Sequence, residues 1–314
     1  PDIKKVLSQS FRVPRAVHAY AEKWVSQIRH REPKEYKPRN FEGEVRLLED
    51  GSYKNPDAII RDAEKYIEQG KTVMFLASCS YMLTGIIERL KKQGILFHNP
   101  YRLKQGQWNP IRLNAGEGKI STVQRLLAYL AGCPEIAPEP RLWTLDEFKQ
   151  WVAIVNSKGN LRHGAKKLLQ EKAGGFLEVD FSDIFEVFAE ESSFWQVFDN
   201  FGLDVALDWF YNNVQAAKAK TLEFPIAVIR KQRKYDALSQ KPKCIVGTIH
   251  SVKGGEADCV YLMPDLSVAG MQEYIKGGEG RDAVYRMFYV GITRARESLI
   301  LCGPGTNFSV RWNI

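Results

Sequence analysis

The chain has 314 residues, of which 44% are hydrophobic, and it carries a net charge of +8. This length allows two domains, and the composition is that of a globular protein rather than a disordered one. No secretory leader and no run of 18 apolar residues is present, which argues against membrane insertion. The five cysteines show no C-x-x-C spacing, so we expect reduced thiols in a cytoplasmic protein and no metal site.

Positive charge is unevenly distributed along the chain. Residues 176–214 contain nine acidic residues and no lysine or arginine, so the remainder of the chain carries +17. A nucleic-acid partner would favour such an excess, although a solvated basic surface explains it equally well.

The first segment with functional character is S-F-R-V-P at residues 10–14. Pro14 precedes a helical pattern over residues 15–28, and an arginine beside a helix N-terminus lies near a potential anion site. Taken alone, Arg12 is more typical of an ordinary surface arginine. Residues 43–48 alternate like a strand, and residues 56–69 form a helical pattern that Gly70 ends.

The triplet Gly70-Lys71-Thr72 is not a phosphate-binding P-loop. That motif, G-x-x-x-x-G-K-[ST], follows a strand and opens a helix, so that the glycine-rich backbone wraps the phosphates. Here Lys65 occupies the position of the first glycine, and the triplet follows a helix and precedes a strand.

The middle of the chain is predicted to be an insertion. A strand over residues 72–77 and a helix over residues 82–93 form half of a βαβ unit, and its second strand, residues 244–249, comes much later. Between them, helical patterns begin at Ser121, at the capping box Thr144–Glu147 and at Pro225. We therefore expect a mostly α-helical inserted domain over residues 101–242.

The acidic stretch of this insertion is also rich in aromatic residues. Aromatics among acids favour a helical core with a solvated outer face over a surface that stacks single-stranded nucleic acid. A protein docking surface remains an alternative, which a large exposed apolar area would support.

The C-terminal part places polar residues between two buried strands. Residues 244–262 read as two apolar runs joined by a short polar turn, and loops held in this way usually carry function. A helical pattern over residues 282–294 then ends at Thr293, Arg294 and Arg296, where cationic groups can also simply complement the helix dipole. Residues 298–302 form a closing apolar strand.

Three ordered motifs resemble the C-terminal half of superfamily 1 DNA helicases of the UvrD/Rep type. They are S-F-R at residues 10–12, T-x-H-S-x-K-G-x-E at residues 248–256 and V-x-I-T-R-A at residues 290–295. The resemblance implies an α/β fold, with a RecA-like parallel-sheet lobe built from residues 1–100 and 243–314 and interrupted by the helical subdomain 101–242. Asn99-Pro100-Tyr101 with Gly106 looks like the turn that leads out of that lobe.

The resemblance also implies roles for individual residues. Arg12 and Arg294 would be the catalytic arginines on the γ-phosphate of ATP, and Phe11 would stack on the adenine. Gly254 and Glu256 would lie at the nucleotide. Single-stranded DNA would contact Thr248, His250, Ser251 and Lys253, and Lys166 and Lys167 are candidates for contacts with duplex DNA.

Arginine suits contact with the γ-phosphate because its planar guanidinium group can bind two phosphate oxygens at once and stays positively charged. The sequence contains no P-loop, and the apolar run that ends in Asp265 lacks the acidic neighbour that a magnesium-binding Asp-Glu pair would supply. We therefore expect a C-terminal fragment of an ATP-dependent DNA helicase, inactive alone. In the full-length enzyme, ATP and Mg²⁺ would bind between this lobe and an N-terminal RecA-like lobe, and the DNA partner would be a single strand or a single/double-strand junction, tracked 3′ to 5′.

Alternatives remain open at this stage. The chain could belong to a non-catalytic DNA-binding or loading module, or to the helicase part of a helicase-nuclease. Gly255 replaces a leucine that is usual in the family, so we expect a more flexible turn around Glu256.

Overall fold

The computed structural model describes residues 9–29, 31, 36–102, 106–139, 141–172 and 177–314. Contacts between Cα atoms divide the chain into two compact units. Unit 1 comprises residues 1–90, 96–110 and 242–314, and unit 2 comprises residues 91–95 and 111–241.

Unit 1 is built on a six-stranded parallel sheet in the order β1-β6-β5-β2-β4-β3. Its strands are β1 (Glu44–Leu48), β2 (Val73–Ala77), β3 (Phe97–His98), β4 (Cys244–Thr248), β5 (Ala257–Leu262) and β6 (Ala295–Cys302). The predicted pairing of β2 with β4 is confirmed, with Phe75 opposite Val246. The α/β fold class, with a parallel sheet drawn from both parts of the chain, is therefore confirmed.

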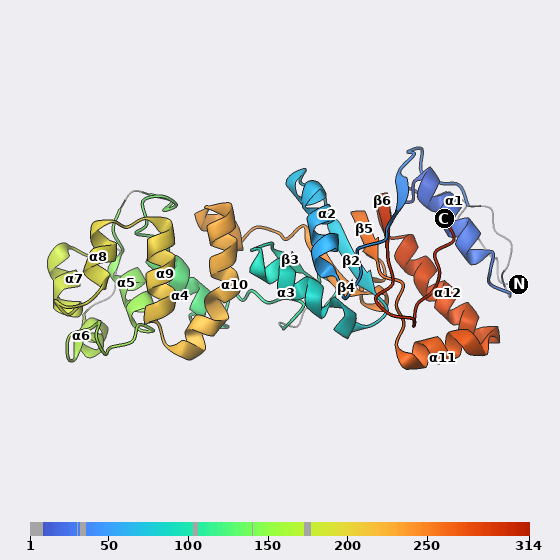
Figure 1. Ribbon diagram of the computed structural model, residues 1–314. Helices are drawn as coiled ribbons and strands as arrows, with labels where there is room; N and C mark the ends of the chain where they lie inside the picture. The colour runs from blue at the N-terminus through green and yellow to red at the C-terminus, as the bar shows by residue number, and fades with distance from the viewer. Residues whose placement is uncertain (1–8, 30, 32–35, 103–105, 140, 173–176) are drawn as a thin grey trace, which may run out of the picture. The chain divides into compact units, whose positions relative to one another are not determined.

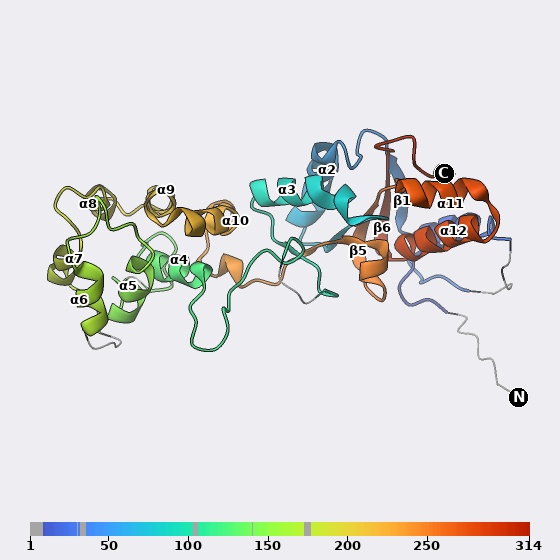
Figure 2. The same ribbon diagram turned by 90° about the horizontal axis from the view of Figure 1, so that it is seen from below.

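Helices cover both faces of this sheet, as all-parallel sheets require. Figure 1 shows α2 and α3 on one face and α1, α11 and α12 on the other, and Figure 2 shows the same layers from below. The helical segments of unit 1 are α1 (Arg15–Val25), α2 (Pro56–Glu68), α3 (Thr84–Lys92), α11 (Val268–Lys276) and α12 (Gly278–Ile292), with short 3₁₀ turns η1 (Ser80–Leu83) and η3 (Ile249–Val252).

The packing of α1 on α12 joins distant parts of the sequence. Trp24 of α1 is fully buried, its ring lies 5.2 Å from that of Tyr285 in α12, and its Nε1 donates to the Tyr285 carbonyl oxygen at 3.0 Å. Both helices belong to one apolar cluster with Met74, Val260 and Leu299 of the sheet. Burial of such large apolar side chains stabilises the juxtaposition of the two segments.

Unit 2 is helical around an aromatic core. Its helical segments are α4 (Thr122–Leu130), α5 (Leu145–Val152), α6 (Ala165–Glu171), α7 (Phe181–Val187), α8 (Phe194–Asp199), α9 (Leu203–Asn213), α10 (Ala216–Gln232) and the 3₁₀ turn η2 (Tyr235–Leu238). Tyr129, Trp143, Trp151 and Phe210 are fully buried, and the rings of Tyr129 and Phe210 stack at 4.6 Å. The expectation of a helical core with a solvated outer face holds for Phe188, Phe194, Trp209 and Phe210 of the acidic stretch, which are buried, whereas Phe181 and Phe185 are exposed.

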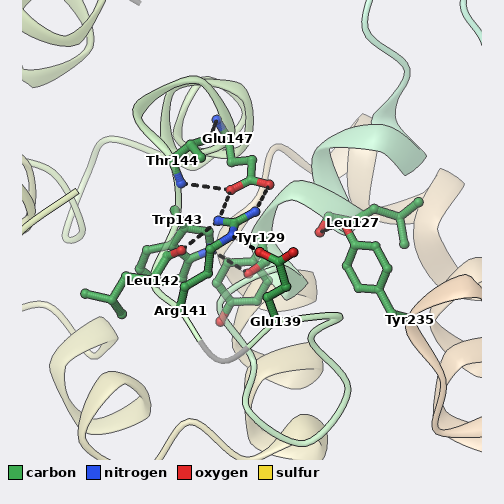
Figure 3. Close-up of polar contacts among 9 residues, drawn as sticks. All are labelled: Leu127, Tyr129, Glu139, Arg141, Leu142, Trp143, Thr144, Glu147 and Tyr235. Carbon is green, nitrogen blue, oxygen red and sulfur yellow. Dashed lines mark hydrogen bonds and ion pairs between the residues drawn. The ribbon is translucent and has the colours of Figure 1, made fainter. Parts of the chain in front are cut away.

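A polar network holds the start of α5 (Figure 3). Thr144 Oγ1 accepts from the Glu147 backbone N–H, and Glu147 Oε2 accepts from the Thr144 N–H at 2.8 Å, which confirms the predicted capping box. Arg141 donates two hydrogen bonds to the same carboxylate, at 2.7 and 2.8 Å. These contacts lower the pKa of Glu147, although its burial acts in the opposite direction.

The prediction that Pro225 opens a helix is wrong. Pro225 lies inside α10, which begins at Ala216. An interior proline removes one backbone hydrogen bond and costs about 3 kcal/mol in a helix. Here the helix buries Leu222, Phe224 and Ile229 along its length, and that packing offsets the local penalty.

Three of the cysteines, Cys244, Cys259 and Cys302, are buried in strands β4, β5 and β6, as their apolar surroundings in the sequence predict. All five cysteines are free thiols. No helix in the described part of the chain has the length and apolar character needed to cross a membrane.

Candidate functional site

The polar turn after β4 is stabilised by two of the residues predicted to contact DNA. Thr248 Oγ1 accepts from the Ser251 backbone N–H at 3.3 Å, and Ser251 Oγ donates to the Thr248 carbonyl oxygen at 2.8 Å. These bonds cap η3 at the carboxyl end of the strand, where ligand sites of parallel sheets form. Both hydroxyls are thus engaged within the turn.

The same turn is held from a second side by Asn99, which is buried. Its Nδ2 donates to the Val246 carbonyl oxygen at 3.0 Å and to Ser251 Oγ at 3.2 Å. A Cβ on Gly247 would come within 2.6 Å of that nitrogen, so only glycine fits there. The sequence located Asn99 in the turn leading out of the lobe but did not indicate this role.

The tip of the turn presents the other two candidate DNA ligands to solvent. His250 and Lys253 are exposed, and neither makes a hydrogen bond or ion pair with another described residue. Gly254 follows with φ at +90°, a left-handed conformation that favours glycine. This geometry leaves one imidazole and one ammonium group available for an external partner.

Gly255 does not leave a void where the family has a leucine. A Cβ at this position would meet the ring of Tyr101, with the hydroxyl oxygen at 2.3 Å. The aromatic ring therefore occupies the space of the missing side chain. The turn at Gly255 is packed, in contrast to the looser turn expected from the sequence.

Arg294 lies between α12 and β6, and its side chain is directed into the protein. The residue is 8% exposed and donates to three neutral acceptors: the Val290 carbonyl oxygen at 2.7 Å, the Gly255 carbonyl oxygen at 3.0 Å and Thr293 Oγ1 at 3.2 Å. No carboxylate of a described residue lies within ion-pair distance of it. Burial, followed by the positive charge of Arg12, lowers the pKa of Arg294 to about 10.

Arg12, from the other end of the sequence, is thus close enough to act on Arg294 electrostatically. Its backbone N–H donates to the buried Ser10 Oγ at 3.2 Å, as does that of Val13 at 2.9 Å. Its Nε is buried and has no hydrogen-bond partner in the described chain. Glu256 acts on Arg294 in the opposite direction. Among the described residues neither arginine forms an ion pair, so the two side chains leave hydrogen-bond donors available for an external anion.

Phe11 and Glu256 complete the predicted set. Phe11 precedes Arg12 and is 87% exposed, which is unusual for a phenylalanine in a chain with a well-packed core. Glu256 is exposed and accepts from Arg296 Nη1 at 2.9 Å. Arg296 therefore forms an ion pair in addition to lying near the end of a helix.

Part of the chain is similar to a known protein family. Residues 243–302 match the UvrD-like helicase C-terminal domain. The UvrD-like segment runs from β4 to β6 and includes the polar turn and Arg294, whereas Phe11 and Arg12 lie outside it. No curated protein matches the chain. The resemblance to UvrD-type helicases is confirmed for this segment.

Two lysines outside the UvrD-like turn, Lys71 and Lys166, have their ammonium groups engaged by groups of the protein itself. Lys71, of the G-K-T triplet, pairs with Glu297 at 2.7 Å directly before β2, in agreement with its rejection as a P-loop. Lys166 donates to the carbonyl oxygens of Ala153 and Val155, at 3.1 and 2.7 Å, so its ammonium group serves the end of α5. Lys167 is exposed and only weakly paired, and it stays a candidate for a duplex contact.

Proposed function

We propose that this chain supplies the second motor lobe of an ATP-dependent DNA helicase. In this proposal, residues 1–100 and 243–314 form the RecA-like lobe and residues 101–242 an inserted subdomain. The sequence contains no P-loop, so the proposal assigns phosphate cradling and the magnesium ligands to a separate N-terminal RecA-like lobe. The free, largely buried thiols support a reducing, cytoplasmic location.

The observation that carries the proposal is the pair of arginines, Arg12 and Arg294. Two like charges close together, one of them buried among neutral acceptors, raise the free energy of the folded chain. A polyanion at this position would relieve the repulsion and use the free Nε of Arg12. The donor set therefore fits a phosphate group.

Each residue then has a distinct role. ATP supplies the transferable γ-phosphoryl group when it is bound. Arg12 and Arg294 neutralise negative charge on its oxygens, and Gly255 orients Arg294 through the 3.0 Å hydrogen bond to its carbonyl oxygen. The exposed ring of Phe11 offers a stacking face for the base, and Gly254 and Glu256 lie at the nucleotide.

The polar turn is proposed as the contact with single-stranded DNA. His250 and Lys253 extend toward the phosphate backbone from a turn whose shape depends on Thr248, Ser251 and Asn99. Gly255 follows Lys253 by two residues, and its carbonyl oxygen accepts a hydrogen bond from Arg294. A movement of His250 and Lys253 on DNA binding would therefore be transmitted to Arg294 at the nucleotide.

The test is Arg294→Ala in the helicase polypeptide that contains this chain. A transferred phosphoryl group that loses an arginine contact reacts about 10³-fold or more slowly, so DNA-stimulated phosphate release should fall by that factor. Affinity for single-stranded DNA, measured by fluorescence anisotropy, should change far less, since His250 and Lys253 are retained and the hydrogen bonds of Thr248, Ser251 and Asn99 still hold their turn. Arg311→Ala removes an exposed arginine outside the site and is the matched control.

Normal turnover in Arg294→Ala would remove this residue from the nucleotide site. A wild-type protein that binds DNA but hydrolyses no ATP would instead favour the loading-module alternative.

A further inference from the structure

Several aromatic residues of the acidic stretch, Phe188, Phe194, Trp209 and Phe210, are buried, but one group on unit 2 is exposed. Phe181 is 61% exposed and Phe185 is 42% exposed, and Trp195 lies partly exposed beside them. We call these three residues the aromatic patch. Leu177, four residues before Phe181, is 80% exposed.

The aromatic patch has a defined geometry. Phe181 and Phe185 are four residues apart on α7, so they share one face of that helix, with ring centroids 6.5 Å apart. Trp195 of α8 lies 5.7 Å from the first ring and 6.0 Å from the second. Its Nε1 donates to the Ala189 carbonyl oxygen at 2.8 Å, which fixes the orientation of the indole. Figure 1 shows α7 and α8 as neighbours in unit 2.

The rings are already organised, so a partner need not order them on binding. The inward face of α7 buries Ile184 and Val187, and α8 buries Phe194 and Val197. The patch therefore lies on the outer face of two helices whose inner faces already pack in the core of unit 2. Exposed clusters of large apolar side chains with a defined geometry are typical of interaction sites.

The surroundings of the patch are acidic. Residues 176–214 contain nine acidic residues and no lysine or arginine. Five of these nine carboxylates are paired with cations from outside the stretch. Lys172 pairs with Asp183 at 2.6 Å and with Glu186 at 2.9 Å, Arg162 pairs with Glu190, and Arg230 and Arg233 pair with Asp204 and Asp208. Glu191, between α7 and α8, and Asp199, the last residue of α8, are exposed and make no ion pair with a described residue.

Arg162 of this chain already contacts both an aromatic ring of the patch and a nearby carboxylate. The guanidinium carbon of Arg162 lies 4.5 Å from the centroid of the Phe185 ring, and its Nη2 pairs with Glu190 at 3.2 Å. A cation over an aromatic face contributes about 0.5–1 kcal/mol at an exposed site. The neighbouring ring of Phe181 is more exposed, and Glu191 is next in sequence to Glu190.

We propose that the aromatic patch is a docking surface for a basic segment of a partner protein, one that presents arginine between apolar side chains. The apolar side chains would cover Phe181 and Leu177, and the arginines would face the ring of Phe181 and the carboxylates of Glu191 and Asp199. Nucleic acid is disfavoured here, since the same carboxylates repel phosphate groups. This surface lies outside the UvrD-like segment and does not depend on the helicase assignment.

The test uses this chain and a fluorescein-labelled 12-residue peptide of alternating arginine and leucine with one tryptophan, at about 0.15 M salt. Two control peptides replace every arginine by citrulline or every leucine and tryptophan by serine. We expect measurable anisotropy binding for the first peptide and at least tenfold weaker binding for each control peptide. A lysine version should bind more weakly than the arginine version, because arginine stacks better on aromatic faces.

Variants locate the site. Phe181→Ala and Glu191→Lys should each weaken binding of the arginine peptide at least fivefold. Phe308→Ala removes a phenylalanine of unit 1 that is 45% exposed and should leave binding unchanged. Circular dichroism and thermal unfolding of each variant verify that the fold is retained, which is expected because the altered side chains are exposed.

Several results would overturn the proposal. These are no binding of the arginine peptide at 1 mM, equal binding to wild type and Phe181→Ala, or equal binding of the citrulline peptide. Binding of a single-stranded oligonucleotide that is lost in Phe181→Ala would reassign the patch to nucleic acid.

Discussion

The ring of Tyr101 occupies the position where a side chain at residue 255 would lie, so that a Cβ on Gly255 would come within 2.3 Å of the tyrosine hydroxyl oxygen. Tyr101 follows β3, and Gly255 precedes β5. The Gly255 carbonyl oxygen in turn accepts a hydrogen bond from Arg294. The tyrosine thus supports a peptide unit that positions the arginine.

This relationship predicts strong coupling between the two positions. Gly255→Leu alone forces two groups into the same space and should lower the free energy of unfolding by about 2 kcal/mol. Tyr101→Ala in the same chain opens that space, so the double variant should recover part of the loss. Chemical denaturation of the four chains gives the coupling energy, which should exceed about 1 kcal/mol. Simple additivity of the two single effects would contradict the packing.

Asn99 provides a second stability prediction. Asn99→Leu removes the donor to the Val246 carbonyl oxygen and to Ser251 Oγ, and it leaves polar groups unpaired next to a buried residue. We expect a loss of about 2 kcal/mol in the free energy of unfolding, together with weaker binding to single-stranded DNA. Asn307→Leu, at an exposed position, should change neither quantity. An Asn99→Leu chain as stable as wild type would show that the amide does not hold the turn.

For Lys253 we predict an effect on the salt dependence of DNA binding and none on the stability of the fold. The side chain is exposed and unpaired in the described chain, so Lys253→Ala should not change the unfolding midpoint. If its ammonium group contacts a DNA phosphate, the slope of log K against log salt should fall by about 0.7, the value for one contact with a single strand. Lys54→Ala, also exposed and in unit 1, is the control and should leave the slope unchanged.

The buried thiol of Cys259 should make the free energy of unfolding depend on pH. Burial raises the pKa of this thiol to about 12 from its ordinary value of 9.0. The unfolded chain therefore loses the proton at lower pH than the folded chain, so this thiol's contribution is fully present below about pH 9 and declines between pH 9 and pH 12. At pH 8, iodoacetamide should modify the partly exposed Cys79 and spare Cys259 until denaturant is added. Rapid alkylation of Cys259 in the native chain would contradict its burial.

Much of the fold could be predicted because its signals are local. Continuous apolar runs predicted β2, β4 and β6, and the helical pattern from Ser121 and the capping box at Thr144 predicted the starts of α4 and α5. The error at Pro225 arose from the opposite situation, in which tertiary packing of α10 outweighs the local preference of one residue. Intrinsic propensity is a weak guide where a helix is buried.

The candidate site was less accessible to such reasoning. The proximity of Arg12 and Arg294 was expected from family resemblance alone, because no local pattern links residues so far apart. The contacts of Tyr101 with Gly255 and of Asn99 with Ser251 join residues about 150 positions apart, and the sequence indicated neither. The glycine at residue 255 predicted a more flexible turn, whereas the ring of Tyr101 fills the space beside it.

The strand order of unit 1 also has a consequence for biosynthesis. β1 pairs with β6, and β2 lies between β4 and β5, so neither early strand has a strand partner among the described residues before residue 100. On the ribosome, β2 must wait until the whole of unit 2 and then β4 have emerged, and β1 must wait for β6, which takes about 10–40 s at the usual rates of synthesis. The nascent lobe therefore exposes the apolar strand β2, which is fully buried in the finished fold, until β4 emerges, and a chaperone that shields it would be needed most before residue 248 leaves the exit tunnel.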